Sequence, residues 1–118
     1  MKIEIDLGFD EGDCIDTLTT AIESYSIDYW VERFVNIKRD NNFNVIEATI
    51  EYLDQNDELK RSVLTPATIR RGIKKMFSRG FDVSSDIKQQ LLEEEPTADA
   101  DCADCIIQAA LFGELVYG

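Results

Sequence analysis

The chain has 118 residues, of which 24 are acidic and 12 are basic, so its formal net charge is −12. This length suits one domain over residues 1–118, built around a single core and stable without disulfide bonds. A charge this negative disfavours direct binding to nucleic acid or to an anionic membrane.

The first two predicted elements are a strand and a helix. Residues 2–8 alternate between apolar and polar side chains, which predicts a half-buried strand. Residues 10–25 then carry apolar side chains at helical spacing, behind acidic residues of the kind that favour a helix N-terminus.

Three strands joined by short polar loops are predicted next. Residues 29–37 are rich in aromatic and β-branched side chains, and residues 58–63 complete an antiparallel meander. Between them, residues 44–53 alternate strictly, which predicts one face made of Ile46, Ala48, Ile50 and Tyr52.

A strongly basic helix is predicted from Thr65 to the turn at Gly80. Thr65 suits the N-cap, Pro66 suits the first helical position, and Gly80 suits a left-handed closing residue. The helix has a packing face of Ile69, Ile73, Met76 and Phe77 and an adjoining basic face of Arg70, Arg71, Lys74 and Lys75.

Two further helices are predicted to complete the chain. A short one begins at Ser84 or Ser85, carries Ile87, Leu91 and Leu92 inward, and ends before Pro96. The last runs from Thr97 or Asp99 to Phe112 and is apolar on nearly every side, so it should be buried; Gly113 ends it. Residues 115–117 then return to the sheet as a short strand or pack against it.

These elements predict an α+β fold. The expected architecture is a small antiparallel sheet, made of the meander and the N-terminal strand, with about four helices packed on one face.

The sequence contains no histidine. Histidine is the commonest general base and activator of nucleophiles, so enzymes that use a hydrolytic triad are excluded. No spacing singles out a pair of carboxylates either. We therefore predict a non-enzymatic protein without a cofactor.

Cys102 and Cys105 have the spacing of a redox or metal-binding pair. Three neighbouring acidic residues would raise the pKa of both thiols, which opposes a redox role. A zinc site would need further ligands, and there is no histidine to supply one. We interpret both cysteines, together with Cys14, as small packing side chains and predict no metal site.

From residue 60 to residue 79 the chain holds seven bases and no acid. One interpretation is a surface that binds nucleic acid or an acidic protein. The other, which we favour, is a solvated face that offsets the surrounding negative charge and meets acids of its own chain or of a second copy.

Residues 93–104 hold six carboxylates and no base: Glu93, Glu94, Glu95, Asp99, Asp101 and Asp104. The three glutamates are predicted at a helix C-terminus, where the macrodipole opposes negative charge, so they should cost stability. Two interpretations stay open. One is a surface that imitates duplex DNA, which presents about one negative charge per 1.7 Å of axis. The other is a solvated loop kept for solubility.

The Tyr29-Trp30 pair, residues 64–72 and above all residues 99–118 resemble a family of small bacteriophage and prophage proteins. Such proteins place a Tyr-Trp pair after the first helix and end in Asp-Ala-Asp, then Ile-Gln, then Ala-Leu-Phe-Gly-Glu and a Val-Tyr-Gly tail. They often have glycines before the Tyr-Trp pair, where this chain has Ser-Tyr-Ser-Ile-Asp at residues 24–28. The resemblance implies a phage origin and an intracellular site of action, and it carries no catalytic residue.

From charge and resemblance together, we predict that the protein binds and inhibits a basic host protein of a DNA-handling defence system, as anti-CRISPR and anti-restriction proteins do. The acidic residues 93–104 would occupy a basic DNA channel. The chain has no apolar run suited to a signal peptide or a membrane helix, which predicts a cytoplasmic protein without a membrane partner.

Two alternatives belong to other functional classes. In the first, the protein sequesters a nucleotide signal in a pocket formed by Tyr25, Tyr29, Trp30, Arg70 and Arg71, because aromatic rings and arginines suit such a ligand. In the second, the protein is a phage regulatory or assembly factor that acts as a homo-oligomer.

Overall fold

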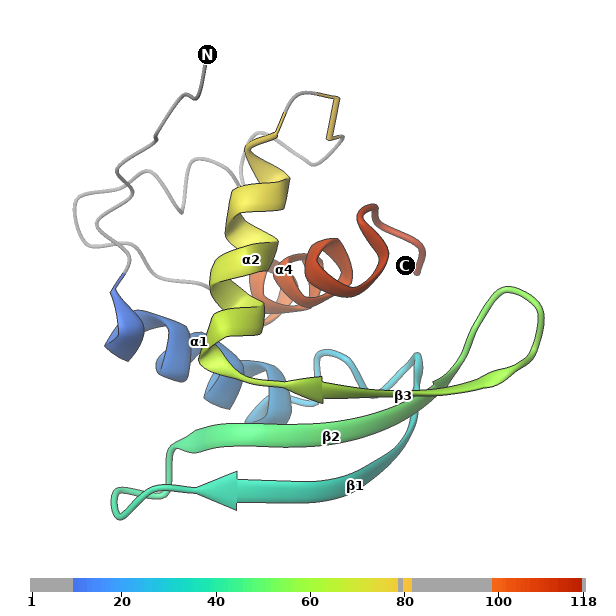
Figure 1. Cartoon of the computed structure of the whole chain (residues 1–118). Helices are drawn as coiled ribbons and strands as arrows, with labels where there is room; N and C mark the ends of the chain where they lie inside the picture. The colour runs from blue at the N-terminus through green and yellow to red at the C-terminus, as the bar shows by residue number, and fades with distance from the viewer. Residues whose placement is uncertain (1–9, 79, 82–98, 118) are drawn as a thin grey trace.

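The computed structural model describes residues 10–78, 80–81 and 99–117. Within them the order of elements is α1 (Glu11–Glu23), β1 (Val31–Arg39), β2 (Val45–Leu53), β3 (Leu59–Leu64), α2 (Pro66–Met76) and α4 (Ala100–Phe112). The helices lie on one side of a three-stranded antiparallel sheet with strand order β1-β2-β3 (Figure 1). The α+β class and the meander are therefore confirmed.

Two predicted elements fall outside the described residues: the strand over residues 2–8 and the short helix after Ser84 or Ser85. The part of the chain that the structure describes holds three helices. None of these three is long and apolar enough to cross a membrane.

The inner face of the sheet follows the predicted alternation along most of β2. Ala48 and Ile50 are fully buried, and Tyr52 is nearly so. The prediction was wrong at the start of the strand, where Val45 is buried and Ile46 is 37% exposed. The cause is a register shift: Lys38 pairs with Glu47, whereas the next residue, Arg39, pairs with Val45. Ile46 is therefore bypassed, and a bulge of this kind redirects the neighbouring side chains.

The outer face of the sheet carries an ion-pair network that spans all three strands. The Glu51 carboxylate of β2 lies 2.6 Å from Arg33 Nη2 of β1 and 3.0 Å from Arg61 Nη2 of β3. Hydrogen bonds from Arg61 and then Arg33 hold the pKa of Glu51 below its usual value. Cross-strand pairs such as these favour this order of strands.

The starts of α1 and α2 are set by local hydrogen bonds. The Asp10 and Asp13 side chains accept hydrogen bonds from each other's backbone N–H groups, which makes a capping box at the start of α1. Thr65 and Thr68 form the same reciprocal arrangement at the start of α2. The predicted N-cap Thr65 is confirmed.

Helix α2 ends earlier than predicted. Its last residue is Met76, and Gly80 adopts a left-handed φ of +86° in the turn that follows. The hydroxyl and the backbone N–H of Ser78 both donate to the Lys75 carbonyl, which replaces the next helical hydrogen bond. The left-handed glycine was thus predicted correctly, but it does not cap the helix.

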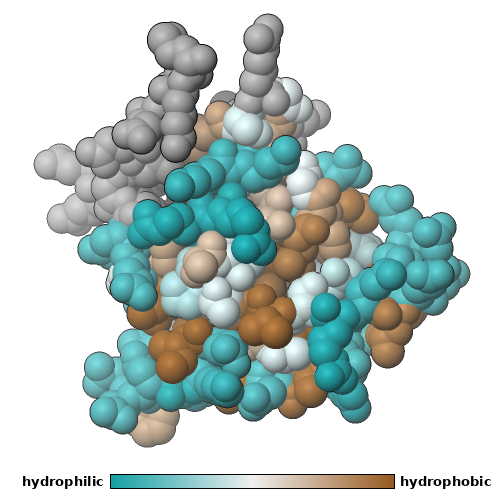
Figure 2. Space-filling model, in the orientation of Figure 1, coloured by the Kyte–Doolittle hydropathy of each residue, from teal (hydrophilic) through white to brown (hydrophobic). Residues whose placement is uncertain are grey.

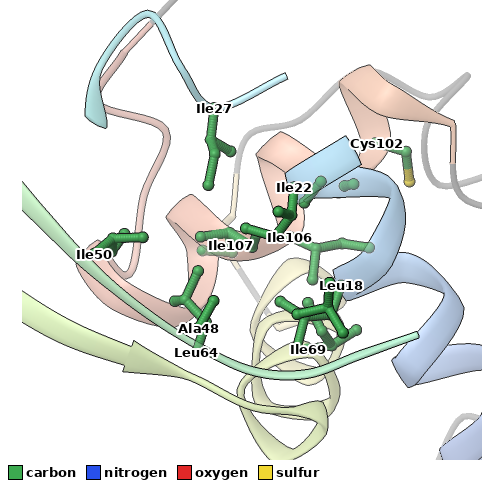
Figure 3. Close-up of a cluster of buried hydrophobic side chains, with 14 of the residues drawn as sticks. Leu18, Ile22, Ile27, Ala48, Ile50, Leu64, Ile69, Cys102, Ile106 and Ile107 are labelled. Carbon is green, nitrogen blue, oxygen red and sulfur yellow. The ribbon is translucent and has the colours of Figure 1, made fainter. Parts of the chain in front are cut away.

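Helices α2 and α4 cross at Gly72, where the two backbones come very close. A Cβ atom placed on Gly72 would lie 2.1 Å from the Ile106 carbonyl oxygen. Around this crossing, side chains from all three helices and from the sheet form one core, in which Leu18, Ile69 and Ile106 are fully buried (Figure 3). The predicted packing face of α2 is confirmed, because Ile69, Ile73 and Met76 are buried and Phe77 packs against the core.

Of the two predicted N-caps of α4, Asp99 is the one that the structure uses. The Asp99 side chain accepts from the Cys102 N–H at 2.8 Å, and Gly113 ends the helix with a left-handed φ of 73°. The helix is also largely buried, as predicted. Of the two predictions for residues 115–117, the packed segment is correct and the returning strand is not.

Candidate partner-binding surface

A strongly one-sided negative charge lies on α1, the loop that follows it and the start of β1. Residues 10–32 contain seven acids and no base. Five of these acids are exposed and form no ion pair within the described residues: Asp10, Glu11, Asp16, Asp28 and Glu32. The other two differ: Arg39 Nη1 lies 2.6 Å from the Glu23 carboxylate, and Asp13 is half-buried. We call residues 10–32 the acidic segment.

Two exposed tyrosines lie in the loop of the acidic segment. Tyr25 is 72% exposed and Tyr29 is 57% exposed, while Ile27 between them is fully buried and anchors the loop. Tyr25 has a left-handed φ of 60°. This conformation favours glycine and is unfavourable for a bulky side chain. The exposed Tyr25 ring is therefore kept at a cost in folding free energy. Exposed tyrosines are typical anchors in protein interfaces.

Asp104 does not belong to an acidic surface, contrary to the prediction. It is 9% exposed, and its carboxylate accepts hydrogen bonds from Tyr29 Oη at 2.5 Å and from Trp30 Nε1 and Gln108 Nε2 at 2.9 Å each. Burial, and then the hydrogen bond to Asp104, raise the pKa of the Tyr29 hydroxyl. Asp104 is a structural acceptor that joins α4 to the start of β1.

Gln108 extends this network to the C-terminal tail. Its Oε1 accepts hydrogen bonds from the N–H groups of Val116 and Tyr117, both at 2.9 Å. The Tyr117 ring stacks on Trp30 with 5.4 Å between centroids and 2° between planes. We did not predict this network from the residues. The only signal in the sequence was the resemblance, since the Tyr29-Trp30 pair, Gln108 and Tyr117 all belong to the segments that carry it.

The other predicted acidic residues are divided between two regions. Asp99 and Asp101 are exposed in the first turn of α4, where Asp99 also caps the helix. Glu93, Glu94 and Glu95 lie outside the described residues.

The predicted nucleotide pocket is not assembled in the described structure. Trp30 is 6% exposed and belongs to the core, so it is not available to line an open pocket. Arg70 and Arg71 are exposed on α2, and no hydrogen bond or ring contact among the described residues joins them to Tyr25 or Tyr29. The positive charge of Arg70 acts instead on Cys14 of α1, where it opposes the effect of burial on the thiol pKa.

The basic face of α2 is exposed as predicted, and Figure 2 shows hydrophilic residues gathered over this helix. Within the described residues its four side chains form no ion pair: Arg70, Arg71, Lys74 and Lys75. The expected contacts with acids of the same chain are therefore not found there. The alternative of self-association rests on this face.

The cysteines are buried or half-buried free thiols. Burial is the main cause that raises the pKa of Cys102 to about 12 and of Cys105 to about 11; the nearby Asp99 and Asp104 add to these shifts. Within the described residues, no group of three cysteine or carboxylate side chains is placed to hold a metal ion.

These raised pKa values predict slow alkylation. At pH 8 the thiolate fraction of either cysteine should be at least about a hundredfold below that of a free thiol, whose pKa is about 8.5. Iodoacetamide should therefore modify Cys102 and Cys105 at least about a hundredfold more slowly in the native protein than in denaturant, as measured on their peptides by mass spectrometry. Rapid modification of native Cys105 would contradict the packing interpretation.

Comparison with protein-family models, with curated protein sequences and with solved structures finds no match.

Proposed function

We propose that the protein is a non-enzymatic, acidic binding protein that inhibits a basic host protein of a DNA-handling defence system. The observation that carries the proposal is the acidic segment, with seven acids, no base and two exposed tyrosines. Such a surface complements a positively charged partner and raises the rate of encounter with it. The phage origin implied by the resemblance supports a host protein as the partner.

The charge density of α1 indicates how far this surface can imitate DNA. Its carboxylates at Glu11, Asp13, Asp16 and Glu23 are spread over about 20 Å of helix, or roughly one charge per 5 Å. Duplex DNA presents about one charge per 1.7 Å. Helix α1 therefore has less than half the charge density of DNA. Imitation of DNA would need the second acidic stretch, with Asp99, Asp101 and residues 93–95.

The test begins with capture of the partner from bacterial lysate and its identification by mass spectrometry. Affinity for the purified partner is then compared between wild type and the double variant Asp16→Asn, Asp28→Asn. Two exposed charges should account for a roughly two- to thirtyfold loss of affinity. The affinity of the wild type should also fall with added salt, because binding is electrostatic.

The matched control is the double variant Asp40→Asn, Asp57→Asn, which removes the same charge from two hairpin turns that tolerate asparagine. An equal loss in both double variants would show that only net charge matters and would contradict a role for the acidic segment. A third variant, with Glu93→Gln, Glu94→Gln and Glu95→Gln, tests imitation of DNA. If residues 93–95 take part, this variant binds more weakly and duplex DNA competes with the wild type.

A further inference from the structure

A hollow of about 310 Å³ lies between the β2–β3 turn and the C-terminal tail. Its lining combines two aromatic rings, two carboxylates and two side-chain amides, and none of its lining residues is basic: Phe112, Tyr117, Asp54, Glu114, Gln55 and Asn56. It belongs to none of the predicted sites.

The aromatic wall of the hollow is held in place by contacts on several sides. Tyr117 stacks on Trp30, and its hydroxyl donates to the Leu53 carbonyl at 2.6 Å. The Phe112 ring meets Trp30 and Tyr52 edge to face, with 5.5 and 5.4 Å between centroids. Because these rings are already ordered, a ligand would bind without the cost of ordering them.

The two carboxylates of the hollow differ in how they are held. Asp54 accepts hydrogen bonds from the N–H groups of Glu58 at 3.0 Å and Asn56 at 2.8 Å, and these bonds lower its pKa. Lys60 lies 3.8 Å from Asp54 but closer to Glu58, at 3.2 Å. Glu114 is exposed and has no ion pair within the described residues.

We infer that this hollow is an anchoring site for a cationic side chain, an arginine guanidinium or a lysine ammonium, presented by a basic protein. Carboxylates attract the positive charge, and the face of an aromatic ring attracts a cation that lies over it. The volume lies at the lower end of the range for ligand sites, about 300 to 1,000 Å³, which suits one side chain better than a nucleotide. Two negative charges also disfavour a phosphorylated ligand.

The inference is tested by NMR on the ¹⁵N-labelled protein, with Nα-acetyl-arginine amide as the probe. Its uncharged isostere, Nα-acetyl-citrulline amide, is the control ligand. The arginine probe should give saturable shifts of the backbone amides of Gln55, Asn56 and Val116. The Trp30 indole N–H should shift as well, because that ring stacks against Tyr117. The citrulline probe should give no saturable shift.

The variant Glu114→Gln should weaken binding of the arginine probe about two- to fivefold, as expected for one exposed ion pair. The control Asp40→Asn removes an acid of the β1–β2 turn, outside both the hollow and the acidic segment, and should leave binding unchanged. Equal binding of the two probes, or an unchanged affinity in Glu114→Gln, would overturn the inference.

The anchoring role rests on the proposed function, whereas binding of the probe does not. If the probe binds as described but no basic protein depends on the acidic segment, the proposed function fails and the cation site stands. If a basic partner is found and excess arginine probe does not displace it from the wild type, the anchoring role is overturned and the proposed function stands.

Discussion

Replacing Gly72 by alanine is expected to lower the free energy of unfolding by about 2 to 4 kcal/mol. The new Cβ would lie 2.1 Å from the Ile106 carbonyl oxygen and 2.9 Å from its Cγ2. The first of these atoms is main chain, so no change of rotamer relieves the overlap, and α2 and α4 have to move apart. The measurement is urea unfolding followed by the fluorescence of the one tryptophan, Trp30.

The variant Gly12→Ala is the matched control, because Gly12 lies on the exposed side of α1. Its added Cβ would meet only the Asp10 Oδ1 atom, at 3.2 Å, so this capping side chain has to give by only a few tenths of an ångström. Alanine also favours helix over glycine by about 1 kcal/mol. The control should therefore stay within about 1 kcal/mol of wild type. Similar losses in both variants would show that the close crossing of α2 and α4 is not the cause.

The second large effect is expected for Asp104→Ala, which should cost about 3 to 5 kcal/mol. The substitution removes the acceptor of three hydrogen bonds and leaves the buried Trp30 indole N–H and Gln108 amide without it. Gln108 Nε2 keeps two longer contacts, to Tyr29 Oη at 3.2 Å and to the Tyr117 carbonyl at 3.3 Å. Among the described residues, Asp104 is the one hydrogen-bond acceptor of the Trp30 indole N–H, so the cost falls mainly on that buried donor. Urea unfolding measures the loss, and near-ultraviolet circular dichroism reports the order of the aromatic cluster.

Tyr29→Phe is the corresponding control, since its ring is 57% exposed. It removes one of the three hydrogen bonds to Asp104 and a longer one, of 3.2 Å, that the hydroxyl accepts from Gln108 Nε2. It should cost only about 1 kcal/mol. If Asp104→Ala lowers the free energy of unfolding by less than about 1 kcal/mol, the structural role of Asp104 is contradicted. The predicted place of Asp104 on an acidic surface would then be favoured.

The fold class and most helix ends could be predicted because they depend on residues close in sequence. Asp10, Thr65 and Asp99 accept hydrogen bonds from N–H groups three residues further on, and Gly113 takes the left-handed conformation that glycine favours. Alternation along β2 predicted Ala48, Ile50 and Tyr52 on the buried face. The prediction failed at the end of α2, where two local preferences compete. The helical spacing favours a longer helix, but the Ser78 hydroxyl donates to the Lys75 carbonyl and the helix ends at Met76.

The sequence by itself determined the negative charge, the absence of histidine and the positions of the caps, since composition and local hydrogen bonds need no tertiary contact. Only the tertiary structure decided the role of Asp104. In the sequence it is one of six acids in residues 93–104, and its hydrogen-bond partner Trp30 is 74 residues away. The tertiary structure also decided the role of Gly72. Nothing in its neighbouring residues indicates that the backbone of Ile106 lies against it. The same is true of the hollow beside Tyr117, whose two carboxylates come from a turn and a tail that meet only when the core forms.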